Sequence, residues 1–290
     1  MQRPDVLVLG AGGTIGGAWL GGMLAGIAEQ TGIDFAACER IVGTSAGAMV
    51  AADLLAGVEP RAGRGPAAFN GAPSLPAEDE PAGGRAARFG ARLASATGTS
   101  LAPIALSLGR TPGALVRAVA LTRVDEPSRT LDDLGQRIAH HELSWDGRLR
   151  IACVDRRSGR RVVFGSPGAP TATIAEAVQA SCSIPGFYRP VRIGENEYVD
   201  GAVWSPTNMD AAPAGRETHV LCLAPMGGPL GTRERHPAVR AATIAALRLE
   251  TLALRRRGAH VTVVVPEPAD QNEHARVVGF RQGRALALDS

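Results

Sequence analysis

A five-residue glycine motif constrains the fold of this chain more than any other feature. Residues 43–47 read Gly-Thr-Ser-Ala-Gly, between a short apolar run that predicts a strand and residues 48–55, which predict a helix. The pattern G-x-S-x-G at such a junction is typical of a nucleophile elbow. Gly43 and Gly47 leave room for a sharp turn, so the Ser45 hydroxyl would stand at the positive end of the helix. In a chain with 36 Gly the motif could also be an ordinary turn.

Length and hydropathy indicate one globular domain. With 290 residues, 45% of them hydrophobic, the chain can bury one sizeable core, and we expect a single domain over residues 1–290. No apolar run approaches the ~18 residues of a membrane span. The run at residues 6–9 is too short for the core of a signal peptide. We therefore expect a cytoplasmic protein, and a net charge of +3 leaves peripheral contact with anionic lipid open.

Charge and cysteine content argue against several functional classes. All 31 basic residues are arginine, which excludes mechanisms that need a catalytic or phosphate-binding lysine. The net charge is too small to indicate a nucleic-acid partner. Cys38, Cys153, Cys182 and Cys222 form no C-x-x-C pair. We expect them to be buried free thiols that form neither a zinc site nor a disulfide framework.

A second glycine-rich segment, residues 10–17, follows the predicted strand at residues 6–9. Residues 18–30 carry apolar side chains at helical spacing, and Gly32 ends that helix. A glycine loop between a strand and a helix presents backbone N–H groups that can bind a phosphate or an oxyanion. The dinucleotide pattern G-x-G-x-x-G fails, because Ile15 stands where its last glycine should be.

A looser pattern, G-x-x-G-x-x-G, is met by Gly10, Gly13 and Gly16 and leaves open that the chain is a nucleotide-binding protein. That function predicts an acidic residue at the end of the second strand, where it would bind the ribose. The second predicted strand instead ends at Val42 and runs into the motif around Ser45. The loop is therefore better suited to an oxyanion.

The rest of the chain alternates strands with helices, which indicates a layered α/β fold. Residues 57–98 shift to Ala, Gly, Pro and Arg, which predicts a disordered insertion, a linker rather than a flap over the site. Helices are predicted at residues 101–108, 113–122, 131–139, 173–180, 237–257 and 272–288, and strands at 149–154, 161–164, 197–199, 220–223 and 261–265. Thr130 is the predicted N-cap of the helix at residues 131–139.

Two arrangements could supply the base that would activate Ser45. The first is a histidine triad completed by Asp200 or Asp210. Its candidate histidines are His219, His236, His260 and His274. The second is a carboxylate acting alone, since Asp200 closes a predicted strand and precedes Gly201. A structural role in a turn would also explain the Asp-Gly pair at Asp200, as it would explain the other Asp-Gly pair, which begins at Asp146.

Taken together, these segments resemble the patatin-like phospholipases. The resemblance rests on residues 10–24, on residues 43–47, on the Ala-Ser-Cys-Ser-Ile-Pro-Gly stretch at 180–186, and on Asp-Gly-Ala at 200–202, in the family's order and spacing. It implies a three-layer α/β/α patatin-like fold with a mainly parallel central sheet.

The resemblance also implies a mechanism. Ser45 would be the nucleophile and Asp200 its partner in a Ser-Asp dyad that needs no histidine. The backbone N–H groups of Gly12, Gly13 and Thr14 would form the oxyanion hole, where one donor is worth about 10²–10³ in rate. The implied substrate is a lipid or other acyl ester, cleaved by a phospholipase, lysophospholipase or esterase reaction, with neither a metal nor an organic cofactor.

The chain departs from the family in one place. The family's glycine loop carries a basic residue just before its last glycine, where this chain has Ile15 or Gly16, depending on how the loop is matched. Because this cation is missing, the sequence does not determine which of the three N–H groups are the donors of the oxyanion hole. It also leaves open a catalytically weak member of the family that works through binding.

Overall fold

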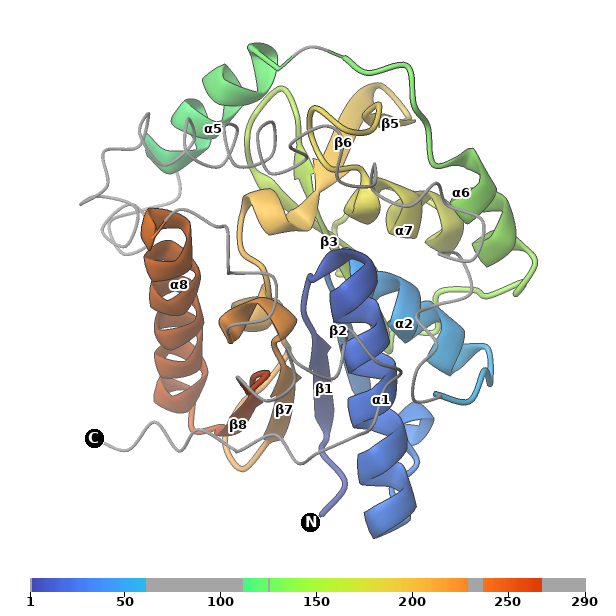
Figure 1. Ribbon diagram of the computed structural model, residues 1–290, viewed down its shortest axis with the longest axis vertical. Helices are drawn as coiled ribbons and strands as arrows, with labels where there is room; N and C mark the ends of the chain where they lie inside the picture. The colour runs from blue at the N-terminus through green and yellow to red at the C-terminus, as the bar shows by residue number, and fades with distance from the viewer. Residues whose placement is uncertain (1, 61–111, 125, 229–236, 268–290) are drawn as a thin grey trace.

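The computed structural model describes residues 2–60, 112–124, 126–228 and 237–267, which form one sheet with helices on both faces (Figure 1). The strands are β1 Val6–Leu9, β2 Arg40–Gly43, β3 Leu149–Asp155, β4 Arg161–Phe164, β5 Val191–Ile193, β6 Asn196–Asp200, β7 His219–Leu223 and β8 His260–Val264. The helices are α1 Gly13–Thr31, α2 Ala46–Leu55, α5 Pro112–Thr122, α6 Asp132–Ala139, α7 Ile174–Cys182 and α8 Pro237–Arg256. Short 3₁₀ helices lie at Phe35–Ala37, Gly201–Val203, Met209–Ala211 and Pro225–Gly227.

The sheet is mixed, with parallel pairing through its centre. β3, β2, β1, β7 and β8 are parallel neighbours in that order. β4 and β6 pair antiparallel with β3, and β5 pairs antiparallel with β6. Parallel neighbours need crossover connections, which α1 supplies between β1 and β2 and α8 between β7 and β8. The predicted α/β class with a mainly parallel sheet is confirmed.

Alternate side chains of β1 enter two separate cores. Leu7 and Leu9 face a core that α1, α2, α6 and α7 complete. Val6 and Val8 face a second core under α8. In Figure 1, α1 and α8 lie on opposite sides of the central strands. Burial on both faces explains why this strand is an uninterrupted apolar run, and it makes the fold three layers.

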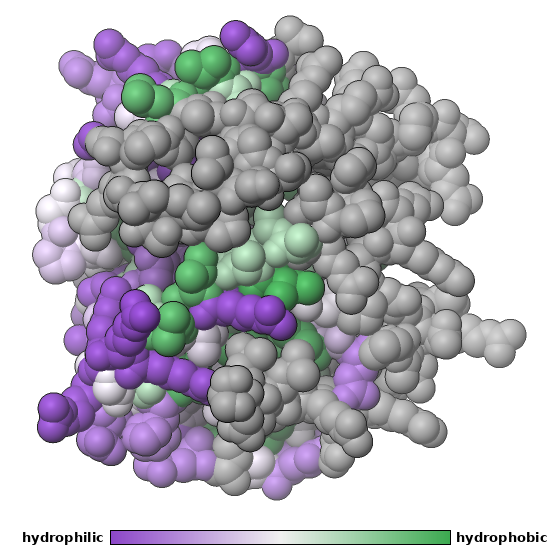
Figure 2. Space-filling model, turned by 90° about the vertical axis from the view of Figure 1, so that its left-hand side faces the viewer, coloured by the Kyte–Doolittle hydropathy of each residue, from purple (hydrophilic) through white to green (hydrophobic). Residues whose placement is uncertain are grey.

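Figure 2 shows the side of the molecule that carries α8, where hydrophilic side chains lie beside a smaller hydrophobic area. On α8 itself, Arg248 and Arg256 are exposed, and Leu252 is an exposed large hydrophobic residue. Among the described helices, none is long and apolar enough to cross a bilayer.

Three local expectations were wrong. α1 begins at Gly13 and not at residue 18, so the later part of the glycine loop is the first turn of the helix. Strand β5 was not predicted, since three residues are too few to show a period. Thr130 does not cap α6, because its hydroxyl donates to the Asp132 carboxylate and Leu131 takes the N-cap position. The predicted helices at 101–108 and 272–288, and the predicted insertion beyond residue 60, lie outside the described residues.

Candidate active site

Two strands end head to head on one edge of β3. Ile151 pairs with Gly43 at the end of β2 and, on its other edge, with β4. Cys153 pairs with Asp200 at the end of β6, again on the edge opposite β4. Because β2 runs parallel to β3 and β6 runs antiparallel to it, the two carboxyl ends converge. This topology brings Ser45, which follows β2, beside Asp200, although 155 residues separate their positions in the sequence.

The turn that carries Ser45 is a strained strand-to-helix junction. Ser45 has φ 54° and ψ −120°, a conformation that costs a side-chain-bearing residue of order 1–3 kcal/mol and occurs mainly at functional sites. A Cβ at Gly43 would lie 2.6 Å from the Ala48 Cα, and a Cβ at Gly47 would lie 2.0 Å from the Leu9 carbonyl oxygen. The two glycines of the motif are therefore required by close approach.

Replacing the second of these glycines is expected to destabilise the fold. In Gly47→Ala the methyl group would overlap the backbone of β1, and we expect a loss of about 3 kcal/mol or more in the free energy of unfolding. Urea titration followed by circular dichroism measures it. Gly22→Ala in α1 is the matched control, because a Cβ there meets no atom within 4 Å and alanine favours helices. Equal stability of Gly47→Ala and wild type would contradict the close approach.

Asp200 is a buried carboxylate at the end of β6, on the side of β3 where Ser45 follows β2. The residue is 2% exposed, and its Oδ1 accepts a hydrogen bond from the Ala202 N–H at 2.8 Å. Burial raises the pKa of Asp200 from 3.8 to about 7, and hydrogen bonds from the Ala202 N–H and the Ser45 hydroxyl limit this rise. A carboxylate with a pKa near neutrality is suited to act as a general base.

The side chain of Ser181 holds the Ser45 turn through two hydrogen bonds. Its hydroxyl accepts a hydrogen bond from the Ser45 backbone N–H at 2.9 Å and donates one to the Ala152 carbonyl at 2.8 Å. Ala152 is the β3 residue between the partners of Gly43 and Asp200. Ser181 thus links the turn to the strand that aligns the site. The sequence offered only its place in the 180–186 stretch and nothing that indicated this contact.

The glycine loop begins beside the same turn. Leu9 pairs with Gly43, and the Leu9 carbonyl accepts the Thr44 N–H at 3.0 Å. Within the described part of the chain, no group accepts a hydrogen bond from the N–H groups of Gly12, Gly13 or Thr14. Such N–H groups at a helix start are free to bind an anion.

Two of these loop positions require glycine, for different reasons. Gly13 has φ +60°, a left-handed conformation that glycine adopts at little cost. A Cβ at Gly12 would lie 2.6 Å from the Gly16 Cα. Ile15, one of the two places where the family carries a cation, exposes 51% of its surface.

The histidine triad receives no support from the described residues. His219 and His260 stack on each other, with ring centroids 5.0 Å apart, at the starts of β7 and β8. The starts of these strands lie at the end of the sheet opposite Ser45, which follows the carboxyl end of β2. Neither histidine therefore lies where it could act as the base. His236 and His274 lie outside the described residues. Asp210 is bound by Arg161.

Neither a nucleotide site nor a metal site is supported by the geometry of the described residues. β2 ends at Gly43 without the carboxylate that a nucleotide ribose would need. No group of three or more His, Cys, Asp or Glu within the described ranges could hold a metal ion. All four cysteines are buried and free, as expected. Asp146 lies in the expected turn, where its carboxylate accepts the Arg148 N–H at 2.9 Å.

Comparison with protein families decides the identity of the fold. The model of patatin-like phospholipases matches residues 7–213. The chain belongs to the patatin-like phospholipase family. The match includes both Ser45 and Asp200, whereas α8 and β8 lie beyond the matched patatin-like segment. Comparison with curated proteins gives no match.

Solved structures similar to this patatin-like chain share little sequence with it. VipD from Legionella pneumophila matches with a TM-score of 0.37 and 17% identity, over 77% of this chain and 50% of that one. A chain from the complex of full-length SpcU with full-length ExoU, from the type III secretion system of Pseudomonas aeruginosa, matches with a TM-score of 0.31 and 19% identity. That match covers 88% of this chain and 53% of the other. The chain thus spans about half the length of these solved chains.

Proposed function

We propose that this protein is a serine acyl-ester hydrolase that cleaves lipid acyl esters, in a reaction of the phospholipase, lysophospholipase or esterase type. The observation that carries the proposal is the convergence of Ser45, held on a strained turn after β2, and the buried Asp200 at the end of β6. Family membership supports the substrate class. The exposed apolar side chain of Ile15 at the glycine loop suits contact with lipid at a membrane surface.

The proposed reaction proceeds in two steps. Asp200 takes the Ser45 proton as Ser45 Oγ attacks the ester carbonyl, and the N–H groups of Gly12, Gly13 and Thr14 stabilise the oxyanion. The tetrahedral intermediate collapses, the proton passes to the leaving alcohol, and an acyl ester on Ser45 remains. Water then attacks this ester while Asp200 accepts its proton, and as the second intermediate collapses Asp200 returns that proton to Ser45 Oγ and the fatty acid leaves. No metal or cofactor takes part in either step.

Labelling with a fluorophosphonate tests the proposal without knowledge of the substrate. We expect the probe to modify Ser45 in the native protein, as located by mass spectrometry of peptides, and to leave the urea-denatured protein unmodified. Since only ionised Asp200 can accept the proton, the labelling rate should rise with pH and level off above about 7. Absence of labelling across this range would contradict an activated serine and favour a family member that acts through binding.

A further inference from the structure

One buried carboxylate of the described chain has no part in the proposed reaction. Glu250 of α8 is 7% exposed, and its Oε2 accepts hydrogen bonds from Thr207 Oγ1 at 2.5 Å and from the Met209 N–H at 2.9 Å. Both donors lie in residues 205–209, which we call the clamp loop. Burying a carboxylate is costly unless donors such as these compensate.

The clamp loop contacts each of the three parts of the site. The Pro206 carbonyl accepts the Ala11 N–H of the glycine loop at 2.8 Å. Asn208 Nδ2 donates to Thr44 Oγ1, next to the nucleophile, at 3.2 Å, and to the carbonyl of Gly201, next to Asp200, also at 3.2 Å. The clamp loop therefore links the glycine loop, the Ser45 turn and the end of β6, in addition to the contacts made through Ser181 and β3.

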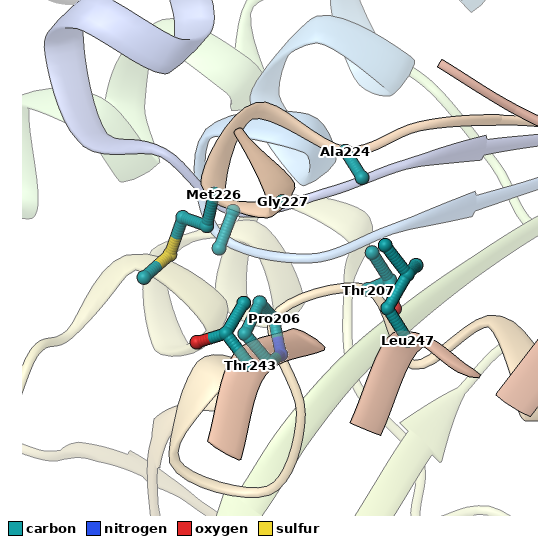
Figure 3. A pocket seen from close by; sticks show the side chains of 8 residues that line it. Pro206, Thr207, Ala224, Met226, Gly227, Thr243 and Leu247 are labelled. Atoms are coloured by element: carbon teal, nitrogen blue, oxygen red, sulfur yellow. The ribbon is translucent and has the colours of Figure 1, made fainter. Parts of the chain in front are cut away.

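The contact between the clamp loop and α8 includes a small pocket. Figure 3 shows it, with Pro206 and Thr207 on the loop side and Thr243 and Leu247 on the α8 side. Ala11 of the glycine loop also lines it. Packing is incomplete at this point, and the two hydrogen bonds to Glu250 add a further link between the loop and α8.

We propose that Glu250 is a positioning residue for the Ser45 site, which anchors the clamp loop to α8 and so aligns the glycine loop with the nucleophile and the base. The inference rests on the proposed function and extends it to a helix beyond residues 7–213 that the family model matches. Misplacement of catalytic groups by about 1 Å can lower rates about 10²-fold, so the anchor would act on turnover and not on substrate binding.

Kinetics of four variants on a p-nitrophenyl acyl ester test the anchor. Glu250→Ala should lower kcat by about 10- to 100-fold and leave KM within about threefold, because the loop loses its acceptor. Glu250→Gln should recover most of this loss, since its amide oxygen can accept the same two bonds. Thr207→Val removes one donor at constant shape and should lower kcat severalfold. Thr251→Val is the control, because the neighbouring buried Thr251 hydroxyl donates to the Leu247 carbonyl of its own helix and not to the clamp loop.

Hydrogen exchange by mass spectrometry gives a readout that needs no activity. Glu250→Ala should speed exchange at the Ala11 and Met209 amides relative to Thr251→Val. The proposal is overturned if Glu250→Ala keeps kcat within threefold of wild type, if Glu250→Gln falls as far as Glu250→Ala, or if the Ala11 amide is unaffected. Should Glu250→Ala not fold, Glu250→Gln and Thr207→Val carry the same test. A wild-type protein without turnover would refute the proposed function, while exchange would still test the anchor.

Discussion

Ser45→Ala is expected to lower turnover of acyl esters by about 10⁴-fold or more, because a hydrolase that loses its nucleophile keeps only binding and oxyanion stabilisation. Alanine has a Cβ like serine, so it takes the same strained backbone conformation, and the variant should remain folded. Release of fatty acid from phosphatidylcholine vesicles and hydrolysis of a p-nitrophenyl ester, measured side by side, report this loss for both substrate types.

The matched control for this variant is Ser183→Ala. Ser183 is also a buried serine near the site, but its hydroxyl donates to the Gln179 carbonyl, and its hydrogen bond with Asp200 is made by its backbone carbonyl, which alanine keeps. We expect its turnover to stay within about threefold of wild type. Ser45→Ala protein that retained wild-type hydrolysis after purification would refute the mechanism, and equal losses in both variants would point to packing rather than nucleophilic attack.

Asp200→Asn is expected to abolish turnover and yet stabilise the fold. An amide cannot accept the Ser45 proton, so we expect a loss of about 10³-fold or more in kcat. The same change removes a carboxylate whose ionised form is destabilised by burial. The Asn oxygen can still accept the Ala202 N–H, which keeps the local hydrogen bond.

The stability difference should depend on pH in one direction. Burial raises the folded-state pKa of Asp200 from 3.8 to about 7, so between these values the folded state binds more protons than the unfolded state. Stability of the wild type therefore falls as pH rises through this window. Relative to wild type, Asp200→Asn should be equally stable near pH 4 and more stable by up to about 4 kcal/mol at pH 8.

Asp53→Asn is a control with the opposite expectation. Asp53 is another mostly buried carboxylate, but Arg137 bonds it at 2.5 Å and His141 at 3.0 Å, away from Ser45. Its loss should weaken the fold and leave turnover unchanged. Urea titrations of the three proteins at pH 4.5 and pH 8 separate these cases. A less stable Asp200→Asn protein at pH 8 would contradict the destabilising burial of the base.

Most of the fold could be predicted from local patterns. Buried parallel strands such as β1 and β2 are short apolar runs next to glycine, and helices such as α8 show their period clearly. The wrong boundary of α1 has a physical cause, since a helix whose first turn is Gly-Thr-Ile-Gly-Gly has no apolar period and poor helix propensity there. Pro225 lies close to that turn, since a Cβ at Gly16 would come within 3.1 Å of its side chain, and this proximity is not visible in the local sequence.

The site could be predicted only in part. Ser45 and Asp200 stand at strand ends with neighbouring glycines, so both could be named as candidates from the sequence. Their approach depends on β6 pairing antiparallel with β3, which no local pattern specifies. Ser181 and Glu250 were missed for the same reason, because their hydrogen-bond partners lie 136 and 43 positions away. A buried serine or glutamate inside a helix carries no sign of its distant partner.

The head-to-head ends of β2 and β6 bear on when this chain becomes reactive. Ser45 leaves the ribosome early, but Asp200, its partner in the proposed mechanism, is made only 155 residues later and must then dock against β3. Pairing over such sequence separations is slow to form. Under the proposed mechanism we therefore expect a nascent chain, or one cut before β6, to carry an unactivated serine until β6 has paired with β3.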